Sequence, residues 1–227
     1  MIAVPSAAQE ASPAQDLIAR SIEHHDPDDR WWSHVRTVTV EQTRPDGPTS
    51  RVRVTLFPDT SHFRMRMDEG EAFVEVMRSD TTCTFASSAD DNAVPETFGD
   101  LTCDDVQWRQ EYYGFLLGLP MNLRDGEATI EPDVRAMQWE GRPVHAVRAR
   151  YPGDEPVWDF YFDPDTAQLV GCAFSSEGAL ADGETIVFEG TAEANGIQLP
   201  KARRWFTNAD DRLLGTDTVV SFETSLP

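Results

Sequence analysis

Residues 51–67 have the sequence RVRVTLFPDTSHFRMRM, in which two alternating runs flank a short turn. The apolar residues of both runs fall on one face of an extended chain, and arginines occupy most of the other face. The apolar positions are Val52, Val54, Leu56, Phe63, Met65 and Met67. A period of two with one charged face is typical of an antiparallel sheet with one side in water. This stretch therefore predicts two neighbouring, half-exposed strands.

Similar alternation continues along the chain. The further predicted strands are residues 71–77, 81–85, 134–139, 144–151, 157–162, 168–174, 185–189, 201–206 and 213–222. Turn-forming pairs such as Asp182-Gly183 and Asn195-Gly196 separate most of them. Short strands at this spacing indicate a sandwich or barrel-like sheet. We find no linker that divides residues 13–227, and we predict that they form a single domain.

A first helix is predicted near the start of the chain. Ser12 and Gln15 have the spacing of a capping box, and Pro13 occupies the first helical position. The helix should end near His25, because Asp26 precedes a proline and is disfavoured in the helical conformation.

A second helix is predicted from Thr102 to Gly118, with acidic residues in its first turn, where the helix dipole favours them. Val106, Gln110, Tyr113 and Leu117 fall on one stripe, flanked by Tyr112 and Leu116, and the stripe is mainly aromatic and aliphatic. A face this apolar needs an apolar partner, and the hollow side of the sheet is the expected one. We therefore expect an α+β, mostly β fold in which a curved antiparallel sheet wraps one or two helices.

The charge balance limits the classes of partner. The 227 residues include 40 acidic and 19 basic side chains, for a net charge of −21. A surface this acidic disfavours nucleic acids and anionic lipid headgroups. No stretch has the roughly 18 apolar residues that a membrane span needs. Residues 1–12, which include Ser6-Ala7-Ala8, are expected to be a disordered terminus or the remnant of a signal peptide.

Five local runs carry a family resemblance that extends from about residue 13 to 223. They are His25-Asp26-Pro27 followed by Trp31, residues 112–121 (YYGFLLGLPM), 158–164 (WDFYFDP), 195–200 (NGIQLP) and 214–218 (LGTDT). Together they resemble an uncharacterised family of bacterial envelope proteins with a LolA/LolB-like fold, the fold of outer-membrane lipoprotein-sorting proteins. None of the five runs is a catalytic signature.

The resemblance implies an antiparallel half-barrel of about ten strands closed by helices. It also implies a periplasmic, outer-membrane-associated or secreted location. In characterised proteins of this shape, the space between sheet and helices holds acyl chains, so a hydrophobic small molecule or acyl chain is the expected partner.

The cysteines have two interpretations. Cys83 lies in a predicted strand and Cys103 at the start of the second helix, so a disulfide would join helix to sheet. Such a bond contributes about 3 kcal/mol in the chain-entropy model. An oxidising compartment permits it, and free buried thiols are the alternative. Cys172 is expected to be a small core residue.

The strongest candidate for catalysis is the run His24-His25-Asp26, which suggests a metal-assisted hydrolase using His25 and Asp26. Adjacent residues point in different directions, however, and the sequence offers no third ligand. A charged imidazole that caps the helix end is the simpler role. No nucleophile elbow, phosphate loop or dinucleotide fingerprint occurs. We expect no enzyme activity, no bound metal and no cofactor.

Methionine and aromatic side chains are the candidate ligand-binding residues, since Met adapts to irregular apolar guests. The set is Phe63, Met65, Met67, Phe73, Tyr113, Phe115, Met121, Trp139, Trp158 and Phe160. These residues either fill the core or line a cleft of roughly 300–1,000 Å³. The leading hypothesis is a non-catalytic envelope protein that binds or carries a lipid or acyl chain between sheet and helices. The alternative to it is a protein-interaction module with a filled core and an exposed apolar patch.

Overall fold

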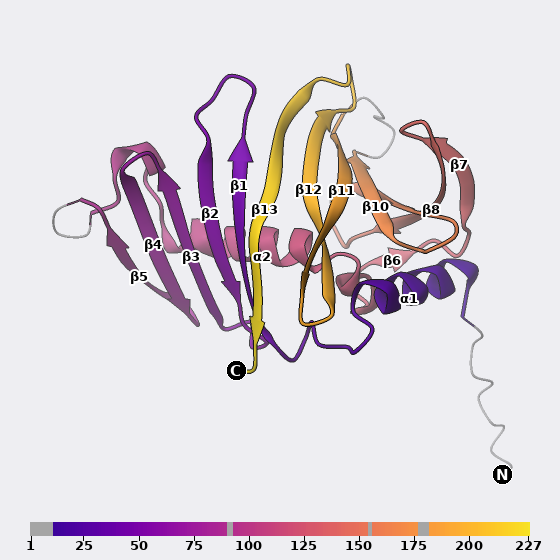
Figure 1. Cartoon of the computed structure of the whole chain (residues 1–227), viewed down its shortest axis with the longest axis horizontal. Coiled ribbons are helices and arrows are strands. Elements are labelled where there is room, and N and C mark those ends of the chain that lie inside the picture. The colour runs from indigo at the N-terminus through magenta and orange to yellow at the C-terminus, as the bar shows by residue number, and fades with distance from the viewer. Residues whose placement is uncertain (1–10, 90–92, 154–155, 177–181) are drawn as a thin grey trace, which may run out of the picture.

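The computed structural model describes residues 11–89, 93–153, 156–176 and 182–227. Within these ranges, a 13-stranded antiparallel sheet curves around α2 and contacts α1 at one end (Figure 1). This confirms the predicted fold class. Residues 1–10, which make up most of the predicted disordered or signal-peptide segment, lie outside the described residues.

The helices are α1 (Pro13–His25), η2 (Glu96–Phe98), α2 (Cys103–Gly118) and η3 (Met121–Arg124). The strands are β1 (Val35–Thr43), β2 (Ser50–Leu56), β3 (His62–Glu69), β4 (Ala72–Ser79), β5 (Thr82–Ser87), β6 (Thr129–Ile130), β7 (Arg135–Trp139), β8 (Arg142–Arg150), β9 (Val157–Phe162), β10 (Leu169–Ser175), β11 (Glu184–Ala194), β12 (Ile197–Thr207) and β13 (Leu213–Ser225).

The strand order is β5-β4-β3-β2-β1-β13-β12-β11-β10-β9-β8-β6, and β7 also pairs with β8. Most neighbours in the sheet are neighbours in sequence, as expected for hairpins. The exception that shapes the fold is the pairing of β1 with β13. It joins an N-terminal half of the sheet, β1–β5, to a C-terminal half, β8–β13, and α2 crosses behind both halves (Figure 1).

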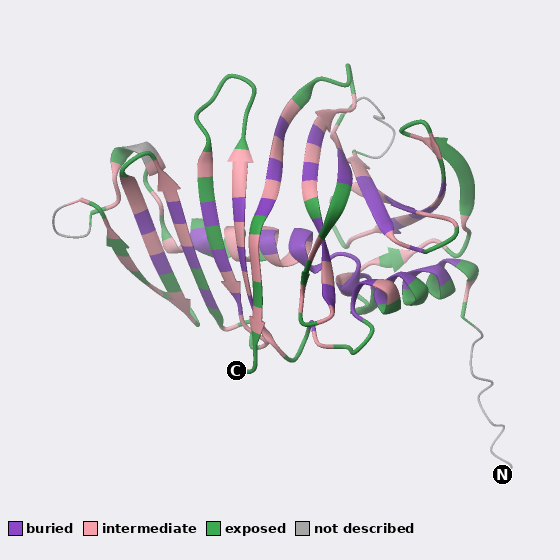
Figure 2. Cartoon of the chain, in the orientation of Figure 1, coloured by how far each residue is buried: buried purple, intermediate pink, exposed green. Residues whose placement is uncertain are grey.

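The alternation in residues 51–67 gives the sheet an inner face toward α2 and an outer face toward solvent. All six of its apolar residues are buried, and the register places Val54 opposite Met65 across β2 and β3. Figure 2 shows the resulting bands of buried and less buried residues along these strands. The arginines of the same runs lie on the outer face.

The start of α1 matches the sequence prediction in detail. The backbone N–H of Gln15 donates to the Ser12 hydroxyl, and the Ser12 N–H donates to Gln15 Oε1 at 2.8 Å. Pro13 occupies the first helical position, and the helix ends at His25. The buried stripe of α1 contains Leu17, Ile18 and Ile22, and the helix contacts η3 and β12.

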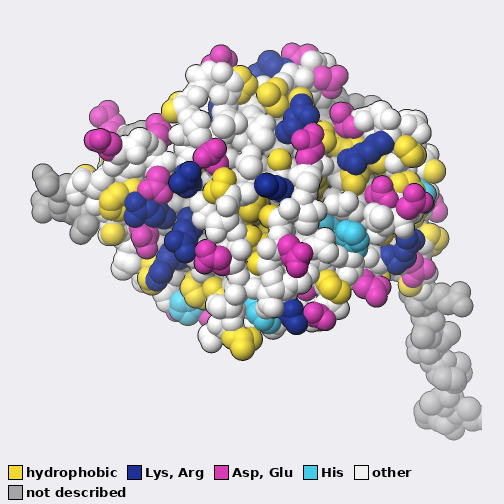
Figure 3. Space-filling view, in the orientation of Figure 1, with side chains coloured by type: hydrophobic (Ala, Val, Ile, Leu, Met, Phe, Trp, Pro, Cys, Tyr) yellow, Lys and Arg dark blue, Asp and Glu magenta, His cyan; other side chains and the backbone are white. Residues whose placement is uncertain are grey.

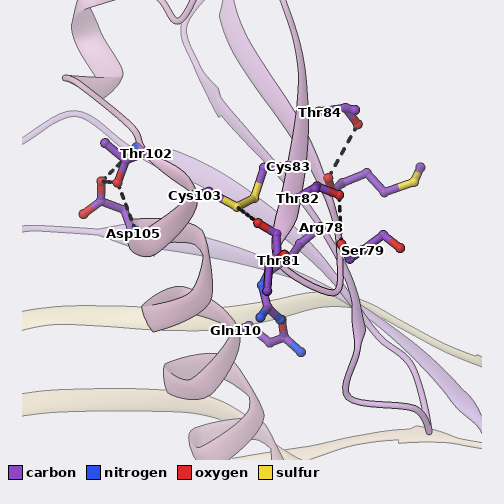
Figure 4. The surroundings of a disulfide bond; sticks show 11 residues. Arg78, Ser79, Thr81, Thr82, Cys83, Thr84, Thr102, Cys103, Asp105 and Gln110 are labelled. Carbon is purple, nitrogen blue, oxygen red and sulfur yellow. Dashed lines mark hydrogen bonds between the residues drawn. A yellow bond between two sulfur atoms is a disulfide. The ribbon is translucent and has the colours of Figure 1, made fainter.

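The second helix is fixed to the N-terminal half of the sheet. Thr102 and Asp105 form a capping box at its start. Cys103, in the first turn, forms a disulfide with Cys83 of β5, which is the pairing favoured by the sequence (Figure 4). Among the described residues, no helix is long and apolar enough to cross a membrane.

The sequence did not predict β1, although it is the strand that pairs with β13. Val38 and Val40 have the expected alternation, but Arg36 and Gln42 occupy the same inner face as these valines. A search for alternating apolar residues does not identify a strand whose inner positions include polar residues. The sheet consequently has more strands than the roughly ten expected.

Candidate functional site

A cleft of about 360 Å³ opens between α2 and the inner face of the C-terminal half of the sheet. Its lining residues are Arg44, Tyr112, Phe115, Leu116, Trp158, Phe174, Glu184, Trp205, Leu214 and Gly215. The volume falls in the range of roughly 300–1,000 Å³ that is usual for small-molecule sites. We call this space the aromatic cleft.

Ring contacts between α2 and the sheet form its walls. The centroids of Phe115 and Trp158 lie 4.9 Å apart, edge to face, and those of Trp158 and Phe174 lie 4.7 Å apart. Tyr112 stacks on Trp205 at 6.5 Å. Trp158 and Phe174 are cross-strand partners on β9 and β10, so alternation alone brings them to one face. The cleft therefore offers an aromatic surface to an apolar guest.

The aromatic cleft also has a polar border. Arg44 Nη1 lies 3.0 Å from Asp217 Oδ1, and Gln42 Nε2 donates to the same oxygen at 3.2 Å. Arg44 reaches Asp217 across Gly215, where an added Cβ would lie 2.5 Å from Arg44 Nη1. The absence of a side chain at Gly215 thus allows a guanidinium to lie at the edge of a largely apolar space, whose lining also includes Glu184.

Arg203 is buried beside this border. It lies opposite Asp217 across the ladder between β12 and β13, and its Nη1 donates to the Pro200 carbonyl at 3.2 Å. Among the described residues, Arg203 Nε, Arg203 Nη2 and Trp205 Nε1 have no hydrogen-bond partner. Burial lowers the pKa of Arg203 to about 10, although Asp217 opposes this. Because unmatched buried donors are costly, the region suits a group that brings acceptor oxygens.

Two larger cavities differ in character. One, of about 490 Å³, is lined by many charged and polar side chains, including Arg36, Glu111 and Asp125. The other, of about 530 Å³, lies along α1 and η3 beside Ile18 and Leu123. Of these three spaces, the aromatic cleft is the one that contains residues from the predicted ligand set.

The structure divides that predicted set. Phe115 and Trp158 line the aromatic cleft. Six others are enclosed side chains of the core: Phe63, Met65, Met67, Tyr113, Met121 and Phe160. Most of the candidate residues therefore pack in the protein core, and only Phe115 and Trp158 form part of the cleft surface.

Phe73 and Trp139 do not face the interior where the sequence analysis placed them. On β4, Val74 and Val76 take the inner positions, so Phe73 lies on the outer face, where the guanidinium of Arg66 stacks over its ring at 4.0 Å. Trp139 of β7 stacks on Tyr161 at 4.3 Å in a small apolar cluster separate from the main core. In both cases the apolar residue occupies the other phase of the alternation.

His25 is buried and has a structural environment. Its Nδ1 donates to the Gln198 carbonyl at 2.9 Å, and the Leu169 N–H donates to its Nε2 at 3.1 Å. Burial lowers the pKa of His25 to about 4, with a smaller contribution from His24. The ring is therefore neutral near pH 7, and for His25 the expectation of a charged helix cap is wrong.

Asp26 also has a structural role, because its side chain binds backbone groups. Its carboxylate accepts the N–H groups of Arg30 at 2.9 Å and Trp31 at 2.7 Å, so it orders the turn after α1. Among the described residues, no group of three or more His, Cys, Asp or Glu side chains could hold a metal ion. His25 and Asp26 thus have the contacts of structural residues.

Several cleft residues were not in the predicted set. Phe174 and Trp205 lie in predicted strands, and their inner phase could have identified them. Arg44, Asp217 and Arg203 could not be identified in this way, because their proximity depends on the pairing of β13 with β1 and β12. Hydrophobic patterning carries no signal for a polar group that a remote strand brings to the inner face.

The comparisons with known proteins agree with this architecture. The model of a family of unknown function, DUF6503, matches residues 2–222. No curated protein sequence matches the chain. A LolA superfamily protein from Nitrosomonas europaea is similar in structure, with a TM-score of 0.52 at 10% identity, over 96% of each chain.

A DUF1329 family protein from Desulfovibrio piger is similar as well. Its TM-score is 0.51 at 9% identity, over 94% of this chain and 93% of the other. At such low identity these likenesses establish a shared fold. They confirm the structural part of the resemblance seen in the sequence.

Proposed function

This chain belongs to the DUF6503 family, and we propose that it is a non-catalytic envelope protein that binds or carries a lipid or acyl chain in the aromatic cleft. The observation that carries the proposal is the cleft itself. It lies between sheet and helix, is walled by Phe115, Trp158 and Phe174, and has a volume suited to a small hydrophobic ligand. Each methylene group that enters such a space contributes about 0.8 kcal/mol.

The polar border favours a ligand with one oxygen-bearing end. Arg44 lines the cleft, and the unmatched donors of Arg203 and Trp205 lie beside it. A carboxylate or ester oxygen would accept hydrogen bonds from such groups while the hydrocarbon part contacts the rings. An amphiphile fits this arrangement better than a pure hydrocarbon does.

The proposed location is the periplasm, the outer-membrane surface or the secreted medium. The Cys83–Cys103 disulfide supports an oxidising compartment, where such bonds persist. A non-catalytic role is supported by His25, whose two ring nitrogens are both engaged by the backbone.

The test is uptake of a fluorescent fatty acid by the purified protein, compared with a Trp158→Ala variant. We expect saturable binding by the wild type and a Kd at least about tenfold higher in the variant, equivalent to about 1.4 kcal/mol. Trp139→Ala is the matched control, because Trp139 is also a half-buried tryptophan but lies outside the cleft. It should bind the probe as the wild type does.

Native mass spectrometry of the protein as purified gives an independent readout. A co-purified lipid would support the proposal. No bound lipid together with no uptake of the fatty acid would show that the protein is not a carrier of this kind. The interaction-module hypothesis would then be favoured, with the 59% exposed Trp108 of α2 as the first residue to examine.

A further inference from the structure

The outer face of the N-terminal half of the sheet has a basic hollow that the proposed function does not use. The hollow has a volume of about 370 Å³ and is lined by Thr37, Arg53, Thr55, Arg64, Arg66 and Glu75. Figure 3 shows Lys and Arg side chains gathered on this face, over the region of β2–β4. Because inner and outer faces alternate along each strand, the basic hollow and the aromatic cleft lie on opposite sides of the sheet.

The strand register places these positive charges together. Arg53 of β2 lies directly opposite Arg66 of β3, and Arg64 lies opposite Thr55. Like charges at directly opposed positions destabilise a sheet. The chain as a whole is strongly acidic, with a net charge of −21, so a cluster of arginines on one patch is not a consequence of its composition.

The ion pairs of the described residues leave this cluster only partly neutralised. Arg66 lies 2.7 Å from Asp68 and 3.9 Å from Glu75, and Arg64 lies 4.0 Å from the same Glu75. Within the described part of the chain, the side chain of Arg53 forms neither an ion pair nor a hydrogen bond, and its backbone lies in the ladder of β2. Three guanidinium groups and the Glu75 carboxylate line the hollow, and Asp68 is bound to Arg66 beside it, so one positive charge remains in excess.

Hydroxyl groups complete the lining. The Oγ1 atoms of Thr37 and Thr55 lie 3.1 Å apart on the neighbouring strands β1 and β2. One hydroxyl donates to the other, and the second hydroxyl can turn to donate a hydrogen bond to a bound group. Guanidinium groups bind tetrahedral oxyanions in a bidentate manner, and hydroxyl donors add further contacts.

We propose that the basic hollow is a binding site for a phosphate-type oxyanion. A compact anion fits better than an extended anionic surface, because Glu41 and Asp68 occupy outer positions of β1 and β3 and the whole molecule is acidic. A flat anionic bilayer would meet those carboxylates and be repelled. A single phosphate group instead contacts the arginines and leaves the acidic side chains in solvent.

The experiment is a titration of the intact protein with inorganic phosphate at low ionic strength, followed by calorimetry and by the arginine side-chain signals in NMR. We expect saturable binding that sulfate competes for and that chloride at equal ionic strength does not reproduce. An Arg53→Ser variant should lose at least about tenfold in phosphate affinity, because Arg53 is the guanidinium of the hollow that has no side-chain partner among the described residues.

The matched control is Arg204→Ser. Arg204 is also a partly exposed arginine on a strand, but it is paired with Glu189 at 3.1 Å and lies outside the hollow. This variant should bind phosphate as the wild type does. Equal losses in the two variants, or no phosphate binding beyond the chloride control, would overturn the proposal.

Vesicles distinguish the source of the phosphate group. Anionic phosphatidylglycerol vesicles should bind no better than neutral phosphatidylcholine vesicles. Strong binding to the anionic vesicles without binding of free phosphate would refute a compact-anion site and indicate a membrane-docking surface. None of these outcomes depends on the aromatic cleft, so the two proposals can fail separately.

Discussion

The two halves of the sheet follow the same alternation but pack differently under α2. In the N-terminal half, the apolar inner side chains of β2 and β3 are aliphatic, Met or Phe, and all are buried. In the C-terminal half, Trp158 and Phe174 are only partly buried and border the aromatic cleft. Met65 and Met67 are flexible side chains of the kind that fills irregular gaps. We call β1–β5 the filled half, because the apolar inner side chains of β2 and β3 are enclosed. The cavity of about 490 Å³ also borders this half, but its lining is largely polar.

The largest expected effect tests this difference directly, through the same truncation in each half. Phe63→Ala removes a ring that is 0% exposed in the filled half, and should lower the free energy of unfolding by about 3–5 kcal/mol. Phe174→Ala removes a ring that is partly exposed to the cleft, and should cost about 1–2 kcal/mol. Urea denaturation measures both values.

The comparison depends on the difference between the two variants. Similar losses at Phe63 and Phe174 would mean that the cleft is closed in solution and that both halves are filled. The fatty-acid titration adds a second readout, because Phe174→Ala should weaken binding while Phe63→Ala, once shown to be folded, should not.

The disulfide gives the next largest effect, because it ties α2 to the filled half of the sheet. A Cys83→Ala, Cys103→Ala double variant opens a loop of 20 residues and should lose about 3 kcal/mol. Hydrogen exchange should accelerate first in the early turns of α2 and in β5. The same variant should keep the aromatic cleft, which lies at Phe115 and Leu116 further along the helix.

Faster exchange throughout the C-terminal half would contradict this assignment. Cys172→Ala is the control for removing a thiol without removing a disulfide, since Cys172 is a free, fully buried cysteine. Its expected cost is confined to packing around β10.

The sequence was sufficient for the features that depend on near neighbours. The capping box at Ser12, the helix start at Thr102 and the turn at Asn195-Gly196 involve residues within a few positions of each other, and the structure contains all three. The alternation in residues 51–67 likewise predicted which residues are buried.

Features that depend on remote pairing could not be predicted. His25 contacts residues that are 173 and 144 positions away, so nothing near it in sequence indicates that it is neutral and buried. The phase of Phe73 and Trp139 relative to the core, and the meeting of Arg203 with Asp217, depend on strand register. Which inner residues border the cleft depends on where α2 lies, and single-strand patterns do not contain that information.

The smallest of these effects uses pH and concerns the C-terminal half alone. His25 links α1 to β10 and β12 through Leu169 and Gln198. Its pKa is lowered to about 4, so the unfolded chain binds more protons than the folded protein between pH 6.5 and pH 4. The contribution of His25 to the free energy of unfolding is fully present above pH 6.5 and decreases as the pH falls. From pH 7 to pH 5, the loss is about 2 kcal/mol.

The measurement compares how the free energy of unfolding depends on pH in the wild type and in His25→Gln. The variant is needed because carboxylates elsewhere in the protein also make this free energy depend on pH. The wild-type curve should be steeper between pH 7 and pH 5 by the contribution of His25. Protonation of Nε2 also removes the acceptor for the Leu169 N–H. The protection factor of that amide, relative to its intrinsic exchange rate at each pH, should therefore fall at pH 5, while those of the β2 and β3 amides should not. Parallel curves for the two proteins would mean that His25 is protonated as easily in the folded state as in the unfolded chain, and that its link to the C-terminal half is not formed.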